Sequence, residues 1–150
     1  MKSGGPVFAP LLGMKTPSDA RKRTIALQER ALKFTTDVNL ACPGKFTNLP
    51  SATVWGQLVR AADSVSNNLV EAEDASSTAD FLYKIELTLR ETKESRVCLA
   101  KLRLGKLDAF ERLASLEDEA GQLCAIFATI AIKVANRLQR EGAARRRTRT

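Results

Sequence analysis

Apolar residues recur along most of this chain at alternating spacings of three and four, and that repeat marks one face of an α-helix. Four segments show it, and no segment shows the alternation of two that is typical of a strand. The sequence therefore predicts an all-α protein. The four predicted inner faces are Leu27, Ala31, Phe34, Val38 and Ala41; Trp55, Leu58, Ala62, Val65, Leu69 and Ala72; Phe81, Ile85, Leu89, Thr92, Leu99 and Leu102; and Leu116, Ala120, Leu123, Phe127, Ile130 and Val134.

Capping residues predict where each helix begins. The first helix starts at Thr16, with Ser18 as a rival cap, and the second at Ser51. Capping-box patterns place the third start at Ser77 and the fourth at Ser115. The stop signals are glycines or prolines: Pro43 and Gly44 end the first helix, Gly105 ends the third, and the fourth runs to about Arg140, before Gly142.

Helices of this length joined by short loops predict an antiparallel, up-down-up-down four-helix bundle. We assign the bundle to residues 16–141. Residues 1–15 are predicted to be a flexible N-terminal extension, and residues 142–150 a basic, disordered C-terminal tail.

The fourth helix carries a second apolar stripe, rich in small side chains, at spacings of three and four. A helix at the side of a bundle needs only one apolar face, so a second one indicates burial on two sides. We interpret the stripe as a subunit interface; the alternative is that this helix is simply central in its own bundle. The stripe consists of Ala125, Ala128, Ile132 and Ala135.

The sequence contains no histidine, which is the commonest general base and a common metal ligand. Its three cysteines are too far apart in sequence for a cysteine-only metal site, and two of them lie in apolar surroundings typical of a core. Glu117, Asp118 and Glu119 fit the first turn of the fourth helix, where the helix dipole favours negative charge. We therefore predict neither an enzyme nor a cofactor or metal site.

The formal charge of +7 is concentrated at the two ends. Residues 1–23 hold five basic side chains and one acidic, residues 141–150 hold four and one, and the residues between hold fifteen of each. Basic ends indicate a polyanionic partner such as nucleic acid, although a solubilising tail is the alternative. The candidate nucleic-acid-binding residues are Arg21, Lys22, Arg23, Arg140, Arg145, Arg146, Arg147 and Arg149.

The start of the chain has too short an apolar stretch for a signal peptide, and no apolar run is long enough for a membrane span. We expect a cytoplasmic protein that does not bind a membrane.

Residues 57–71 (QLVRAADSVSNNLVE) and 80–95 (DFLYKIELTLRETKES) carry a resemblance to a known family. The first segment resembles the pattern Q-L-x-R-A-A-x-S-[IV]-x-x-N-[IL]-x-E-G of a bacterial four-helix-bundle family. That family includes the proteins encoded in intervening sequences of ribosomal RNA genes. Ala72 departs from the final glycine of the pattern. The resemblance covers about residues 24–140, and it extends to the accessory variability proteins of diversity-generating retroelements.

The resemblance implies a ring-like homopentamer, and through the retroelement proteins it implies RNA and a reverse transcriptase as partners. The motif also places four polar residues on one helix face: Arg60, Ser64, Asn67 and Glu71. This face is either a contact site for RNA or a partner, or a hydrogen-bonded layer that fixes helix or subunit register. We favour register, because Glu71 would repel phosphate.

Two functions follow as hypotheses. The first is a non-enzymatic oligomeric scaffold that binds nucleic acid, RNA in preference to DNA, through its basic ends. The alternative is a protein-interaction adaptor, such as the accessory subunit of a retroelement reverse transcriptase.

Overall fold

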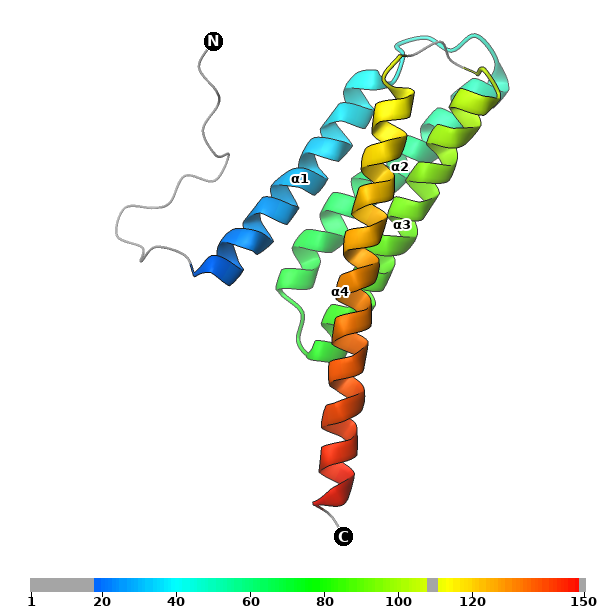
Figure 1. Ribbon diagram of the computed structural model, residues 1–150. Coiled ribbons are helices and arrows are strands. Elements are labelled where there is room, and N and C mark those ends of the chain that lie inside the picture. Colours follow the sequence, from blue (N-terminus) through cyan, green and yellow to red (C-terminus); the bar gives the residue numbers. More distant parts are fainter. Residues whose placement is uncertain (1–17, 108–110, 149–150) are drawn as a thin grey trace.

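Four α-helices make up the part of the chain that the computed structural model describes, residues 18–107 and 111–148, and no strand occurs there. Both the α1–α2 and the α3–α4 connections lie at one end of the molecule, and the α2–α3 connection lies at the other (Figure 1). The prediction of an all-α four-helix bundle is confirmed. The helices are α1 (Asp19–Ala41), α2 (Leu49–Glu73), α3 (Thr78–Leu104) and α4 (Leu113–Arg147).

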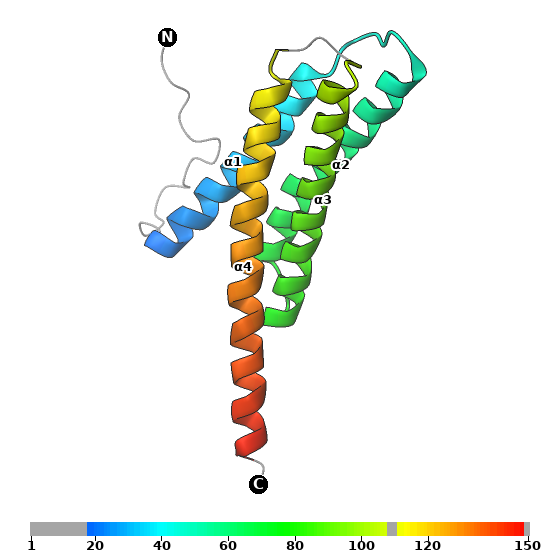
Figure 2. The ribbon, with the colours of Figure 1, turned by 45° about the vertical axis from the view of Figure 1, so that its right-hand side comes forward.

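The core lies where the heptad-like spacing placed it. Trp55 is fully buried, together with Phe34 of α1, Leu99 of α3 and Phe127 of α4. All six predicted inner positions of α2 are buried, whereas Leu27, Phe81, Leu89 and Ile130 pack at the margin of the core. α3 packs closely along both α2 and α4, and α1 packs mainly on α2. Packing is therefore closest around α3. Toward the N-terminus of α1, α1 diverges from α4 (Figures 1 and 2).

Of the four predicted helix starts, Ser77 is confirmed, the first helix uses the rival cap Ser18 in place of Thr16, and the other two starts are wrong. Ser18, the rival cap, accepts the backbone N–H of Arg21, and Ser77 accepts that of Asp80. α2 is capped by Asn48 rather than Ser51, whose N–H donates to the Asn48 side chain at 2.9 Å. Pro50, in the first turn of α2, fits this earlier start because a first-turn proline has no N–H to leave unpaired.

The fourth helix is longer at both ends than the sequence predicted. It begins at Leu113, without a side-chain cap, because Leu113 and Leu116 are buried in the core and their packing outweighs the capping signal of Ser115. It continues through Gly142 to Arg147, so the predicted disordered tail is helical up to that residue. A single glycine in a helix costs only about 1 kcal/mol, and the alanines and arginines that follow it are good helix formers.

The end of α3 agrees with the prediction. Gly105 is the C-cap, and its N–H donates to the carbonyl of Lys101 at 2.9 Å. A side chain at Gly105 would meet that same carbonyl oxygen at 2.8 Å, so space rather than backbone angle demands glycine here. The left-handed conformation falls instead on Lys106, with a φ of 50°. The predicted extension, residues 1–15, lies outside the described residues.

Candidate nucleic-acid interface

The C-terminal part of α4 forms an arm that projects past the other three helices (Figures 1 and 2). We define the arm as residues 128–147. None of its side chains is fully buried, in contrast to the earlier part of the same helix. Arginines in the last turn are favoured by the negative end of the helix dipole. The first turn of the arm still packs against the core through Ile130 and Ala131, whereas its last turn depends more on helix propensity and helix electrostatics.

Positive charge is concentrated on the distal arm. Glu141 is the one acidic residue between positions 137 and 148, and it pairs with Arg137 at 2.7 Å. The other arginines in this stretch are exposed, and Arg140 makes a 3.3 Å hydrogen bond to the carbonyl of Asn136. The candidates brought together on one helical arm are Arg140, Arg145, Arg146 and Arg147, while Arg149 lies outside the described residues.

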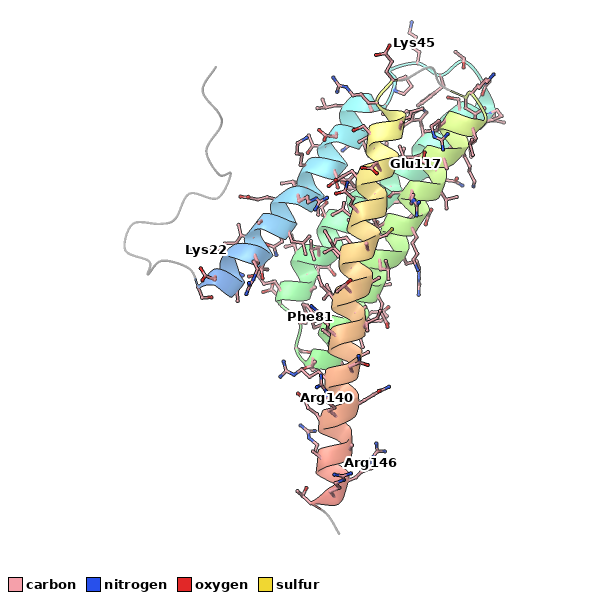
Figure 3. All side chains as sticks on the ribbon, in the orientation of Figure 1. Lys22, Lys45, Phe81, Glu117, Arg140 and Arg146 are labelled. Carbon is pink, nitrogen blue, oxygen red and sulfur yellow. The ribbon has the colours of Figure 1, made fainter. Side chains whose placement is uncertain are left out.

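The basic cluster at the start of α1 is partly occupied by intramolecular pairs. Arg21 forms an ion pair with Glu73 of α2, and the Lys22 ammonium lies 3.4 Å from Asp19. Arg23 is exposed and forms no ion pair within the described residues. Lys22 lies toward the same end of the molecule as Arg140 and Arg146, away from Lys45 (Figure 3). The arm therefore offers more accessible charge than α1 does.

The polar motif of α2 is tied to α3. Arg60 contacts Glu91 at 3.3 Å and Glu94 at 2.6 Å, and its hydrogen bond to Glu94 raises the pKa of the guanidinium. Glu71 pairs with Lys84 at 2.5 Å. These contacts join α2 to α3 at two positions along the helices, which favours the interpretation that the motif fixes helix register.

The other two motif residues play different parts. Ser64 donates to the carbonyl of Arg60, inside its own helix, at 3.0 Å. Asn67 is exposed and lines a groove between α1 and α2 with Val70. Of the four motif residues, Asn67 is therefore the one whose side chain faces an open groove.

The second stripe of α4 faces away from the core. Ala125 and Ile132 are exposed, and Ala128 and Ala135 are half-buried. α4 packs on α3 and, less extensively, on α1; between the described parts of α4 and α2 there is no such packing. α4 is thus not central in its own bundle, and no described residue of the chain covers the stripe.

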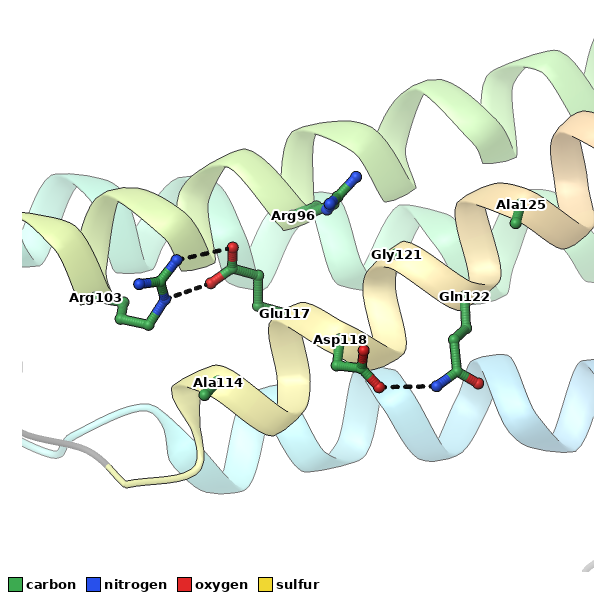
Figure 4. Close-up of a pocket in the computed structure, with 8 residues that line it drawn as sticks. All are labelled: Arg96, Arg103, Ala114, Glu117, Asp118, Gly121, Gln122 and Ala125. Carbon is green, nitrogen blue, oxygen red and sulfur yellow. Dashed lines mark hydrogen bonds and ion pairs between the residues drawn. The ribbon is translucent and has the colours of Figure 1, made fainter.

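A shallow hollow of about 630 Å³ lies between α3 and α4 beside this stripe (Figure 4). Arg103 donates two hydrogen bonds, of 2.7 and 3.2 Å, to the carboxylate of Glu117, and these bonds lower the pKa of Glu117. A side chain at Gly121 would lie 3.6 Å from Nε of Arg96, which is an ordinary van der Waals contact, so the guanidinium does not require glycine here. An ionised, tightly paired carboxylate is poorly suited to general acid catalysis.

The acidic cluster of α4 has a different role from the one predicted. Because the helix begins at Leu113, Glu117 and Glu119 lie beyond its first turn. Glu117 pairs with Arg103 of α3, and Glu119 pairs with Arg30 of α1 at 2.6 Å. Such partners, distant in the chain, could not be read from local spacing. These carboxylates connect α4 to both of its neighbours.

The cysteines and carboxylates form no metal site within the described residues. Cys98 and Cys124 are buried, and burial raises the pKa of both thiols, so both remain protonated and weakly nucleophilic. In the same part of the chain, no helix has a stretch apolar and long enough to cross a membrane.

Comparison with known proteins supports the fold. A crystal structure of a protein of unknown function from the S23 ribosomal protein family of Bacteroides thetaiotaomicron matches with a TM-score of 0.62 and 23% sequence identity. The match covers 73% of this chain and 97% of that one. No protein-family model matches the chain, and no curated protein sequence matches it either. At this identity, the likeness shows a shared helical fold.

Proposed function

We propose that the protein is a non-enzymatic scaffold that binds nucleic acid, RNA in preference to DNA, through the basic arm of α4. The observation that carries the proposal is the helical arm itself, which presents four arginines beyond the bundle against a single, already paired glutamate. Arginine guanidinium groups suit phosphate oxygens, and no aromatic side chain on the arm would stack on bases. Recognition would therefore follow the backbone of the nucleic acid rather than its sequence.

The proposal includes self-association in the cytoplasm. The bundle would be an antiparallel, up-down-up-down unit, in keeping with the positions of its connections, and several copies would assemble into a ring-like oligomer. The uncovered stripe on α4 supports assembly. Several arms in one particle would bind one nucleic acid by avidity, so weak single contacts would combine into firm binding.

The test is fluorescence anisotropy with a labelled single-stranded RNA, using the full-length chain at about 50 mM and about 200 mM salt. The arm variant replaces Arg145, Arg146 and Arg147 with glutamine. A matched control makes the same charge change on the exposed side of α3, at Arg90, Lys93 and Lys101.

We expect wild type and control to bind with affinities that fall steeply with salt, and the arm variant to bind weakly. Each lost phosphate contact lowers the slope of log affinity against log salt by about 0.7 for a single strand, so three lost contacts lower it by about 2. Equal losses in the arm variant and the control would mean that net charge, and not the arm, holds RNA. No binding by wild type would refute the proposal and favour the adaptor hypothesis.

A further inference from the structure

An apolar groove runs between α1 and α2, on a side of the molecule that α4 does not cover. Its volume is about 430 Å³. Val70 and Leu32 line it and remain 54% and 41% exposed, and Ile25 lies beside them. Apolar side chains that are held open along a groove are typical of a surface that binds another chain.

A carboxylate oxygen of Glu29 in the groove indicates which kind of ligand the groove would bind. Glu29 lines the groove, and its Oε1 atom is buried without a hydrogen-bond partner among the described residues. The neighbouring carboxylate, Glu73, is already engaged by Arg21 and by Gln28. A buried acceptor without a partner is costly, so the half-buried Glu29 side chain would gain by turning toward a cation that enters the groove. The groove suits an apolar helix with a basic edge.

The outward face of α4 has both properties. Ile132 is 60% exposed at the middle of the small-residue stripe. Lys133 and Arg140 are seven residues apart, so they lie along the same edge of the helix next to that stripe. Neither forms an ion pair among the described residues. The chain thus carries an apolar groove with an unpaired carboxylate oxygen. It also carries, on α4, an exposed apolar face around Ile132 with two cations, Lys133 and Arg140, that form no ion pair among the described residues; we call this face the ridge.

We propose that the α4 face around Ile132 of one copy docks into the α1–α2 groove of a second copy, with Lys133 or Arg140 reaching Glu29. This inference rests on the self-association included in the proposed function. The two surfaces belong to different helices, so each copy keeps a free groove or a free ridge after it docks. Such a head-to-tail contact builds a closed ring or a filament, and not a two-fold dimer.

The test measures mass in solution by sedimentation velocity for three single variants. Val70→Arg places a cation in the groove against Lys133 and Arg140, and Ile132→Glu places a charge in the ridge. Val97→Arg on α3 is the matched control, since Val97 is the same residue type with 51% exposure and lies outside the groove. We expect the first two variants to associate at least about 100-fold more weakly than wild type, and the control to associate normally.

Mixing the two defective variants gives the sharpest result. The Ile132→Glu copy retains its groove and the Val70→Arg copy retains its ridge, so the mixture should form a one-to-one dimer that grows no further. Normal assembly by Val70→Arg alone would overturn the proposal, and so would a mixture that stays monomeric. A wild type that is monomeric at every concentration would overturn self-association as well, whereas loss of RNA binding alone would leave this proposal standing.

Glu29→Gln tests the charge contact. We expect association to weaken by about tenfold, while the free energy of unfolding of the monomer stays unchanged or rises, because the lost carboxylate oxygen has no partner among the described residues. Unchanged association would overturn the assignment of Glu29 as the partner of Lys133 or Arg140.

Discussion

The two halves of α4 are one continuous helix, yet they depend on different interactions. From Leu113 to Phe127 the helix buries a row of side chains against α3 and α1, and its carboxylates pair with Arg103 and Arg30. From residue 128 onward no described side chain is fully buried, and arginines accumulate. The first half holds the bundle together, whereas the second half contacts the core only at its margin, through Ile130 and Ala131, and exposes most of its charged side chains. The contrast predicts that equal substitutions in the two halves have unequal effects.

The largest difference is expected for leucine. Leu123 is fully buried, whereas Leu138 is half-buried on the arm. Leu123→Ala should lower the free energy of unfolding by about 3–5 kcal/mol, because it removes buried surface and leaves a cavity. Leu138→Ala should lower it by less than about 1 kcal/mol. Urea denaturation measures both, and equal losses would contradict the division of the helix.

Proline substitutions should also distinguish the two halves of α4, because proline disrupts the helix backbone. Ala125→Pro in the bundle half should cost about 3 kcal/mol or more of global stability, because proline removes a helical hydrogen bond and clashes with the preceding turn. Gly142→Pro should leave global stability nearly unchanged, and amide hydrogen exchange should become faster only near the end of the helix. Gly142→Ala is the control, and it should slow that exchange. Global unfolding by Gly142→Pro would show that the arm is part of the bundle.

The half-buried Arg30 should contribute more to stability than the exposed arginines do. It bridges α1 to α4 through two hydrogen bonds to Glu119, at 2.6 and 2.9 Å, and one to Gln122 at 2.8 Å. Because α1 has few other contacts with α4, we expect Arg30→Ala to cost about 1 kcal/mol, the upper end for a solvent-screened pair. Arg60→Ala, on the well-packed α2–α3 side, should cost less than about 0.5 kcal/mol. Thermal or urea unfolding would show the reverse order if α1 were anchored elsewhere.

The smallest effect concerns pH. Arg103 lowers the pKa of Glu117 in the folded chain, so the pair adds stability above the ordinary glutamate pKa of about 4.3 and loses it as the pH falls through the lowered value. Glu117→Gln should therefore be less stable than wild type by under about 1 kcal/mol at neutral pH. The difference should vanish in acid. A difference that persists unchanged in acid would rule out the ion pair as its source.

The core could be predicted from the sequence because burial follows helix periodicity, as the six inner positions of α2 show. The ends of the helices were harder to predict from the sequence. Ser115 has a capping signal, but the burial of Leu113 and Leu116 moved the start of α4. Gly142 has a stop signal, but one glycine among good helix formers did not end the helix.

The sequence predicted which basic residues make up the candidate site, but not how they are arranged in space. The arginines near the C-terminus are evident in the sequence, but their display on a projecting helix follows from where the other three helices end. The pairs of Arg60 with Glu94 and of Arg30 with Glu119 join distant segments, so local patterns contain no sign of them. The α1–α2 groove is likewise a product of packing between two helices, so no local pattern in the sequence reveals it.

The most direct test of the central claim is a hydrogen-exchange footprint of the intact protein with and without saturating single-stranded RNA. If the arm holds the nucleic acid, amides across residues 137–147 should exchange more slowly in the complex, and those in the middle of α2 and α3 should not change. Protection centred on α2 and α3, with none on the arm, would contradict the account and place the nucleic-acid site on the bundle.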